Sequence, residues 1–287
     1  MILCIVGPTG VGKTALSISL AKKYNAIIIN CDAMQIYQDL NIGTAKITEE
    51  EKENIPHYLF DIKKVTEEYS VYDYQKDARY LINKYSNRNI IFVGGTGLYL
   101  KAALYDYRFT LEQDKKDYSS LSNEELYSLV LKKDPNTNIH PHNRKRLERY
   151  LNKEDLNKYP PIKLYNHLII GLTTNRDILY ERINKRVDQM IKNGLINEVK
   201  KYYDQNIKTK PLLGGIGYKE LYAYFDHQVS LEEAIDNIKK NSRHYAKRQY
   251  TFFNNQLEVN WFNVDFNNFN KTIKEIEMFI ERNYPND

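Results

Sequence analysis

The feature that most constrains this chain is an eight-residue loop near its beginning, because it implies both a local fold and a kind of ligand. Residues 7–14 read Gly-Pro-Thr-Gly-Val-Gly-Lys-Thr and satisfy the pattern G-x-x-x-x-G-K-[ST] in full. An apolar run precedes the motif and a helical pattern follows it, so backbone N–H groups can converge on phosphate oxygens at a helix N-terminus. Lys13 adds a full charge, and Thr14 adds a hydroxyl suited to Mg²⁺. We therefore expect a phosphate-bearing ligand, an ATP site included, to be bound by Gly7, Pro8, Thr9, Gly10, Val11, Gly12, Lys13 and Thr14.

Short apolar runs bounded by turn signals predict four buried strands. They are Ile2–Val6, Ala26–Asn30, Asn89–Val93 and His167–Leu172. Helical patterns separate them, over Lys13–Tyr24 after the first run and Val71–Tyr85 before the third. This alternation predicts an α/β fold with a P-loop NTPase-like parallel sheet flanked by helices. In such sheets ligands bind beyond the carboxyl ends of the strands, so the residues that follow each strand are the candidates for function.

The middle of the chain differs from both flanks. Residues 110–165 are polar, with helical patterns near Asn123–Lys133 and Asn143–Leu151 and no convincing strand. We expect a helical insertion domain at 110–165 within a catalytic core formed by residues 1–109 and 166–287.

Composition limits where such a protein can act. The 287 residues include 42 Lys plus Arg against 37 Asp plus Glu, a surplus too small to define a partner. Cys4 and Cys31 lie in apolar runs without metal-ligand spacing, which favours a reduced, buried pair of thiols. No apolar run approaches the ~18 residues of a membrane helix. Because a cleavable signal would remove the phosphate loop, we expect a cytoplasmic protein that does not enter a membrane.

Polar side chains follow the second and third predicted strands at the same edge of the sheet. Asp32 is a candidate base or Mg²⁺ ligand, and equally a helix N-cap of structural importance only. After the third strand come Gly94, Gly95 and Thr96, where many ATP-hydrolysing enzymes have an Asp that helps to place water. A neutral hydroxyl is poorly suited to activating water but can bond to the bridging oxygen of a departing pyrophosphate. The alternative for these residues is a tight strand-to-helix turn.

Ten blocks of sequence, in order and spread over nearly the whole chain, resemble those of the tRNA dimethylallyltransferases (tRNA isopentenyltransferases). The blocks are Gly7–Thr14, Asp32–Tyr37, Asn41–Lys46, Pro56–Asp61, Val93–Tyr99, Ile139–Pro141 with Arg146, Arg182–Met190, Gly194-Leu195 with Glu198-Val199, Ile216–Glu220 and Tyr245–Gln249. The resemblance implies transfer of a dimethylallyl group from its diphosphate to N6 of the tRNA adenosine immediately 3′ of the anticodon, assisted by Mg²⁺.

The resemblance also implies roles for individual residues. Asp32 matches the general base that accepts the N6 proton, and Thr96 matches the threonine that contacts the bridging oxygen of the diphosphate. Arg186 matches an arginine that, with Lys13 and Thr14, neutralises the leaving pyrophosphate, and Thr14 is the expected metal ligand. Electrostatic stabilisation of this kind is usually the largest catalytic contribution. Read without the resemblance, Arg186 would belong to a solvated helix face.

A stacked adenine cannot reach a deep loop, so the resemblance further implies that the target base is extruded into the site. The insertion would grip the anticodon arm, and a basic, aromatic helix near the end of the chain would contact single-stranded RNA. The expected tRNA-binding residues are Asp32, Ala33, Met34, Gln35, Arg146, Arg149, Lys219, Arg243, Lys247 and Arg248. The expected partners are the tRNA anticodon stem-loop and dimethylallyl diphosphate, and the family suggests a monomer.

Three positions depart from the family's pattern. Ala33 replaces the usual Ser after the base, so a hydroxyl contact there is absent or supplied by another group. His142-Asn143 removes a carboxylate from the family's His-Pro-Asn-Asp stretch, and Thr251-Phe252-Phe253 lacks the usual Trp. These departures affect the grip on tRNA and leave Asp32, Thr96, Lys13 and Arg186 in place.

Three other functions fit parts of the sequence. A P-loop small-molecule kinase fits the loop and the sheet, and an adenylate isopentenyltransferase fits the loop and Asp32. Neither needs the helical insertion or a basic helix suited to RNA. A non-enzymatic RNA-binding module would leave the phosphate loop and Asp32 without a use.

Overall fold

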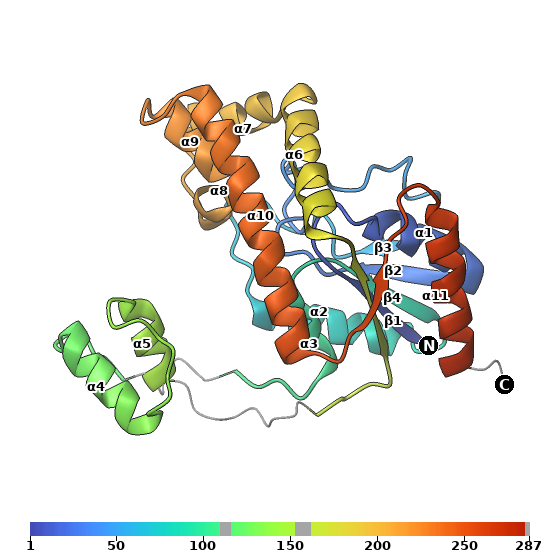
Figure 1. The fold of residues 1–287 in the computed structure, drawn as a ribbon, viewed down its shortest axis with the longest axis horizontal. Helices are drawn as coiled ribbons and strands as arrows, with labels where there is room; N and C mark the ends of the chain where they lie inside the picture. The colour runs from blue at the N-terminus through green and yellow to red at the C-terminus, as the bar shows by residue number, and fades with distance from the viewer. Residues whose placement is uncertain (110–115, 153–161, 285–287) are drawn as a thin grey trace. The chain divides into compact units, whose positions relative to one another are not determined.

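The computed structural model describes residues 1–109, 116–152 and 162–284. The strands are β1 (Ile2–Val6), β2 (Ala26–Asn30), β3 (His57–Tyr58), β4 (Asn89–Val93), β5 (Leu168–Thr173) and β6 (Asn260–Asn263). The helices are α1 (Lys13–Tyr24), α2 (Val71–Lys84), α3 (Gly97–Leu104), α4 (Asn123–Lys133), α5 (Arg144–Leu151), α6 (Arg176–Lys192), α7 (Leu195–Asp204), α8 (Lys210–Gly214), α9 (Tyr218–Phe225), α10 (Leu231–Gln256) and α11 (Phe269–Asn283), drawn in Figure 1.

The strands form one sheet in the order β3-β2-β4-β1-β5-β6, and every neighbouring pair is parallel. The predicted fold class is confirmed, and so are the four predicted strands, with β5 starting one residue later than expected. Two edge strands were not predicted. β3 has only two residues, and β6 begins and ends in asparagine, so neither gives an apolar run of strand length.

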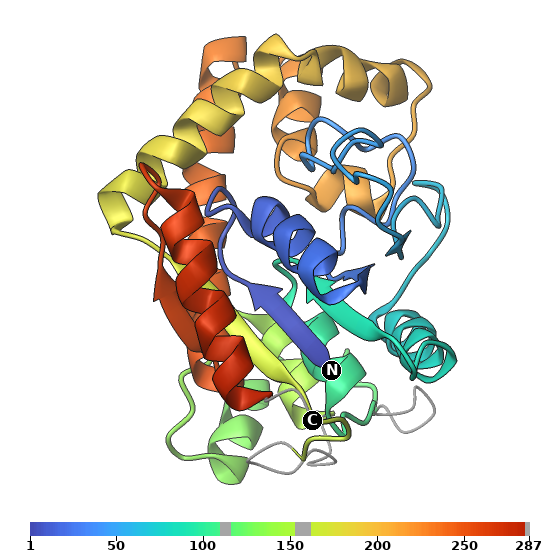
Figure 2. The ribbon, with the colours of Figure 1, turned by 90° about the vertical axis from the view of Figure 1, so that its right-hand side faces the viewer.

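Helices cover both faces of the sheet, as a parallel sheet requires. On the face toward the viewer in Figure 2, α1 and α11 lie against the strands. Their apolar side chains form one core with the strands, in which Leu3, Ile28 and Ile170 are fully buried. On the other face α2 packs against α3, and the Tyr74 and Tyr99 rings stack 4.1 Å apart between these helices. The sheet is therefore packed against helices on both faces.

A second core joins helices α6, α7, α9 and α10 beyond the sheet. Leu195, Val199 and Leu221 are fully buried in it, and Tyr37 and Leu40 from the segment after β2 pack into the same cluster. α10 starts at a Ser230 capping box and continues for 26 residues. It thus connects this helical layer to the sheet, where Phe253 is buried.

The chain divides into two compact units, a core unit (Met1–Leu104 and Tyr165–Asp287) and an insertion unit (Tyr105–Leu164). The insertion unit begins five residues before the expected boundary of 110 and ends one residue before 165. The earlier start has a physical cause, because Tyr105 pairs with Lys163 in an antiparallel bridge. Within this unit α4 and α5 bury Leu126, Val130, Ile139 and Leu147. Residues 110–115 and 153–161 of the expected insertion lie outside the described residues.

Among the helices described, none is long and apolar enough to cross a membrane.

Candidate functional site

A cavity of about 1280 Å³ opens in the core unit beyond the carboxyl ends of the strands. Its walls come from the phosphate loop, the segment after β2, the end of β4, α6, the turn before α9, and α10. Of the predicted site residues, those in the lining are Thr9, Gly10, Gly12, Lys13, Thr14, Asp32, Met34, Gln35, Arg186, Lys219 and Arg248. Among the described residues, the lining excludes the predicted Gly7, Pro8, Val11, Ala33, Thr96, Arg243 and Lys247.

The phosphate loop adopts the geometry that its glycines allow. Gly12 precedes α1 with φ +95°, a conformation that L side chains rarely adopt, and a Cβ there would lie 2.9 Å from the Phe269 ring. The Lys13 ammonium donates to the carbonyls of Gly7 at 3.0 Å and Pro8 at 2.7 Å. From α6, Arg182 Nε donates to the Gly10 carbonyl at 2.9 Å. The loop is therefore braced by α6, a contact that the sequence did not predict.

Three charged side chains, those of Lys13, Arg186 and Asp32, line the same cavity. Burial, and to a lesser degree the nearby Arg186, lower the pKa of Lys13 to about 7, although Asp32 opposes both effects. Burial likewise lowers the pKa of Arg186, and Asp32 again opposes the change. Arg186 Nε is buried without a hydrogen-bond partner among the described residues. A buried N–H donor without an acceptor costs free energy, and so does a buried cation without a counter-charge. A bound anion would remove both costs at this end of the cavity.

Asp32 lies in a turn directly after β2. Its Oδ1 accepts from Met34 N at 3.0 Å, and its own N–H donates to Asn30 Oδ1 at 2.9 Å. Asn30 Nδ2 also donates to the Leu59 carbonyl at 2.9 Å. No helix of the described chain begins at Asp32, so the helix-cap interpretation is wrong. The turn presents the Asp32 carboxylate to the cavity instead.

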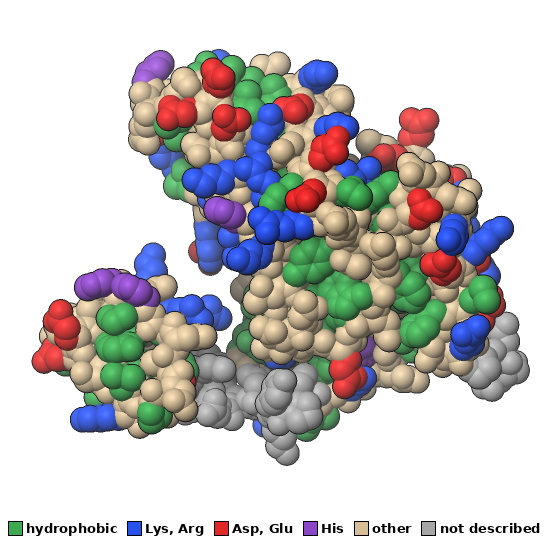
Figure 3. Space-filling view, in the orientation of Figure 1, with side chains coloured by type: hydrophobic (Ala, Val, Ile, Leu, Met, Phe, Trp, Pro, Cys, Tyr) green, Lys and Arg blue, Asp and Glu red, His purple; other side chains and the backbone are tan. Residues whose placement is uncertain are grey.

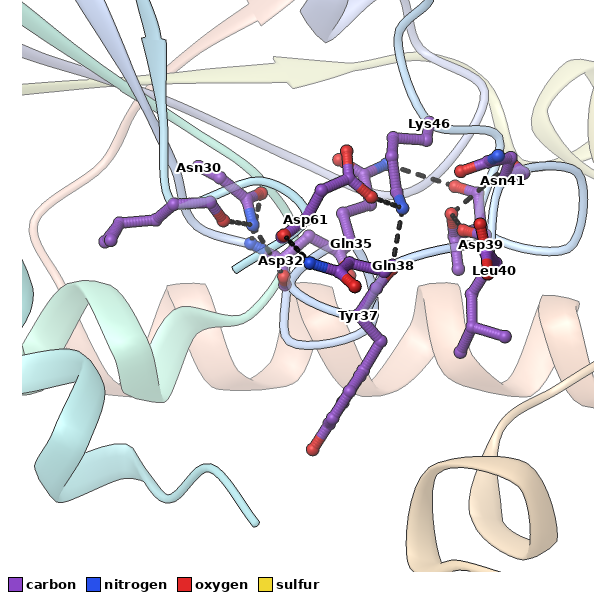
Figure 4. A network of polar contacts seen from close by, with 12 residues as sticks. Asn30, Asp32, Gln35, Tyr37, Gln38, Asp39, Leu40, Asn41, Lys46 and Asp61 are labelled. Carbon is purple, nitrogen blue, oxygen red and sulfur yellow. Dashed lines mark hydrogen bonds and ion pairs between the residues drawn. The ribbon is translucent and has the colours of Figure 1, made fainter. Parts of the chain in front are cut away.

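The segment that carries Asp32 is held by a buried lysine. The Lys46 ammonium, with a side chain 4% exposed, donates to the Tyr37 carbonyl at 2.7 Å and to Asp61 Oδ1 at 2.5 Å. Gln38 Nε2 donates to the Asp61 carbonyl at 2.9 Å, so the two limbs of the segment are linked (Figure 4). These contacts fix the backbone that follows the Asp32 turn.

Glu198 on α7 anchors the same segment at a second point. Its Oε2 accepts from Asn41 N at 3.0 Å and Ile42 N at 2.7 Å. Its Oε1 accepts from Gly43 N at 3.0 Å and from the Tyr218 hydroxyl at 2.7 Å. One carboxylate therefore satisfies four donors and ties the loop to α7 and α9. Glu198 was part of the family resemblance, but the sequence assigned it no role.

Thr96 follows the glycines at the end of β4. Its hydroxyl oxygen accepts from Ala33 N at 3.0 Å, and its N–H donates to the Cys31 carbonyl at 3.0 Å. Gly94 and Gly95 allow this approach, since a Cβ at Gly94 would lie 2.2 Å from Cys31 backbone atoms. The turn joins the ends of β2 and β4, and it holds the Thr96 hydroxyl beside the Asp32 segment.

The predicted basic residues fall into three settings. Lys247 and Arg248 are exposed on α10, where Lys and Arg side chains gather in the face shown in Figure 3. Arg243 donates to Asn184 Oδ1 at 2.6 Å, and the Lys219 ammonium lies 3.6 Å from Glu220. The remaining two, Arg146 and Arg149, are exposed on α5 of the insertion unit.

Two further residues of α10 reach the cavity beside Asp32 and were not predicted as site residues. Gln249 is 5% exposed, and its Nε2 donates to the Gly95 carbonyl at 3.0 Å. Tyr245 lies next to Thr96 and Gln249, and burial together with the charge of Asp32 raises the pKa of its phenol. Their block was recognised as similar to the family, but an uncharged glutamine in a helix gives no signal of its own.

The oxygen ligands in the cavity fit Mg²⁺ only if the ligand contributes. Thr14 offers a hydroxyl, and Asp32 offers a carboxylate in the same cavity. Across the described residues, nowhere do three or more His, Cys, Asp or Glu gather to hold a metal ion. Mg²⁺ commonly binds through one or two protein groups plus phosphates and waters, so the site suits a metal delivered with a diphosphate.

Comparisons with known proteins agree with one another. The family model described as IPP transferase matches residues 35–256. The chain is 46% identical to a tRNA dimethylallyltransferase of Anoxybacillus flavithermus, over 98% of this chain and 96% of the relative. It is 45% identical to the tRNA dimethylallyltransferase of Bacillus subtilis, over 92% of this chain and 90% of the relative.

Solved structures give the same picture. The tRNA isopentenylpyrophosphate transferase of Bacillus halodurans superposes with a TM-score of 0.76 at 45% identity, covering 97% of this chain and 95% of the other. A eukaryotic dimethylallyltransferase solved while acting on tRNA gives a TM-score of 0.79 at 26% identity, covering 98% of this chain and 78% of the other.

Proposed function

This chain belongs to the IPP transferase family, and we propose that it is a tRNA dimethylallyltransferase. It transfers the dimethylallyl group of dimethylallyl diphosphate to N6 of the tRNA adenosine immediately 3′ of the anticodon and releases diphosphate. The observation that carries the proposal is the pairing of an anion-binding end, formed by Lys13 and Arg186, with one carboxylate, Asp32, in a single cavity.

The reaction follows from that pairing. N6 of the adenosine attacks the first carbon of the dimethylallyl group while the carbon–oxygen bond to the diphosphate breaks. The electron pair leaves with the diphosphate, and the Asp32 carboxylate accepts the proton released by N6. Lys13, Arg186 and the backbone N–H groups of the phosphate loop stabilise the charge that develops on the leaving group. A kinase would need a water-excluding lid and a hydroxyl group to accept the phosphoryl group. Prenyl transfer in this cavity needs an amine as the nucleophile.

Two neutral groups complete the proposed site. The Thr96 hydroxyl would contact the bridging oxygen of the diphosphate, and its bond from Ala33 N holds it beside Asp32. Mg²⁺ would be held by the Thr14 hydroxyl with diphosphate oxygens, and it would supply positive charge to the leaving group.

The tRNA would be bound outside the cavity and would insert only the target base. The segment Asp32–Gln35 contacts that nucleotide, and phosphates lie along Lys219, Arg243, Lys247 and Arg248. Arg146 and Arg149 of the insertion unit contact the anticodon stem-loop. This activity fits a monomeric enzyme of the cytoplasm.

A labelling experiment tests the activity. The purified protein is incubated with labelled dimethylallyl diphosphate and Mg²⁺, and with either unmodified tRNA or AMP. We expect label in tRNA only. Label in AMP would indicate an adenylate isopentenyltransferase, and label in neither would refute prenyl transfer.

The role of Asp32 is tested by Asp32→Asn, which keeps the shape of the side chain and removes its basicity. We expect kcat to fall by ~10²–10⁴-fold with tRNA binding nearly unchanged. The control is Asp39→Asn on the same segment, because Asp39 is exposed and forms an ion pair with Lys201 at 3.3 Å. A large loss of tRNA affinity in Asp32→Asn would contradict the assignment of Asp32 as the base.

A further inference from the structure

Gln249 crosses from α10 to the sheet and meets the glycine turn after β4. Its side chain is 5% exposed, and Nε2 donates to the Gly95 carbonyl at 3.0 Å. A Cβ at Gly95 would lie 2.1 Å from Nε2, so only glycine permits the contact. Gln249 is therefore seated against the backbone beside Asp32 by both shape and hydrogen bonding.

This contact fixes which way the amide faces. The Gly95 carbonyl can only accept, so the amide nitrogen must point toward it and a flipped amide would oppose two oxygens. Gln249 also lies beside the Tyr245 hydroxyl, which can accept from the same nitrogen. The amide nitrogen is thus turned toward the Gly95 carbonyl, and Oε1 is directed away from it.

Gln249 Oε1 is an acceptor that the protein leaves unused. It is buried and has no hydrogen-bond partner among the described residues, although Gln249 lines the cavity. Asp32 lies close by, since the position of a Cβ on Gly95 is 3.8 Å from Asp32 Oδ2 and 3.3 Å from Gln249 Cδ. An unpartnered buried acceptor is costly, so a donor from the ligand is expected at this place.

We propose that Gln249 binds the reacting amine of the target adenosine, an inference that rests on the proposed prenyl transfer. The exocyclic N6 group carries two hydrogens. The Asp32 carboxylate accepts the hydrogen that leaves, and Gln249 Oε1 accepts the hydrogen that remains in the product. Two acceptors on the two N–H bonds direct the nitrogen lone pair toward the dimethylallyl carbon.

The hydrogen bond to Gln249 strengthens as the reaction proceeds. N6 gains positive charge while its bond to carbon forms, so the retained N–H becomes a better donor. An interaction that is stronger in the transition state raises kcat more than it lowers KM. The same pair of acceptors repels a purine that carries a carbonyl oxygen in place of the amine, so the site favours adenine over guanine or hypoxanthine.

The test compares two anticodon stem-loops, one with adenosine and one with N6-methyladenosine at the target position. The methyl group replaces the retained hydrogen and removes the bond to Oε1. For the wild-type enzyme we expect kcat to be about tenfold or more lower with the methylated stem-loop. In Gln249→Met, kcat with adenosine should fall about tenfold, and the preference for adenosine over N6-methyladenosine should shrink by the same factor.

A matched control is Gln256→Met, the same change in the same helix at a side chain that bonds Lys101 at 2.7 Å. It should keep the wild-type preference. A role confined to bracing Gly95 would lower kcat equally for both stem-loops, and an unchanged preference in Gln249→Met would overturn the proposal.

The wild-type enzyme alone gives a second test that does not depend on the folding of any variant. Equal turnover of the two stem-loops by the wild-type enzyme would overturn the role of Gln249 while leaving the proposed function intact. No transfer to the adenosine stem-loop at all would instead overturn the proposed function, and this inference with it.

Discussion

Glu198→Gln removes half of the anchor that holds the Asp32-bearing segment. The amide keeps one oxygen, so either Asn41 and Ile42 or Gly43 and Tyr218 must face an NH₂ group in place of an acceptor. A hydrogen bond to a charged acceptor contributes about 1.5–3 kcal/mol. Two such losses would cost about 3–6 kcal/mol if buried. Because the site is partly solvated, we halve this and expect the free energy of unfolding to fall by about 1.5–3 kcal/mol.

The loss should appear in both stability and activity. Urea denaturation measures the free energy of unfolding, and kcat/KM for tRNA reports whether the loop that carries Asp32 is still held. Tyr218→Phe removes one of the four donors and should cost about 1 kcal/mol. The control Glu181→Gln breaks an exposed ion pair with Lys185 on α6 and should leave stability unchanged.

Two results would refute this reasoning. A stability of Glu198→Gln within 0.5 kcal/mol of wild type would show that the four hydrogen bonds contribute little net free energy. A greater loss in Tyr218→Phe than in Glu198→Gln would show that the Tyr218 hydroxyl contributes through contacts other than the Glu198 carboxylate.

Three further predictions follow from other parts of the core unit. Gly94→Ala places a Cβ 2.2 Å from Cys31 backbone atoms and should lower the free energy of unfolding, measured with urea, by ~1–3 kcal/mol. The control is Gly214→Ala, which should not destabilise the protein because no described atom lies within 4 Å of the added Cβ. The pKa of Lys13 is lowered to about 7, and a bound diphosphate favours the charged form, so affinity for dimethylallyl diphosphate should fall as pH rises above 7. Calorimetry across pH 6–9 tests this prediction. An equally steep fall in Lys13→Arg would contradict it. Arg248→Ala should weaken tRNA binding and reduce the slope of log affinity against log salt by about one, and an unchanged slope would exclude a phosphate contact at this exposed side chain.

The parts of the fold that the sequence predicted are those whose signal is local. β1, β2, β4 and β5 correspond to short apolar runs of sequence that turn signals bound on both sides. This pattern is typical of parallel strands buried on both faces. β6 at the edge of the sheet pairs only with β5, so nothing requires it to be apolar throughout.

The candidate site divides in the same way. The phosphate loop was predictable because its glycines and Lys13 act within eight residues of chain. Glu198 and Gln249 were not, because their partners lie 155 and 154 residues away, at Gly43 and Gly95. A side chain whose role is to meet a distant backbone atom leaves no periodicity or spacing in the sequence.

The position of β1 in the middle of the sheet has a consequence for how this protein is made. β1 leaves the ribosome first, yet one of its two neighbours, β5, is synthesised about 160 residues later. Until β5 is made, β1 lacks one of its two neighbours, and the growing sheet has an apolar edge that invites chaperone binding. The pocket beside Gly95 is completed later still, when α10 supplies Gln249.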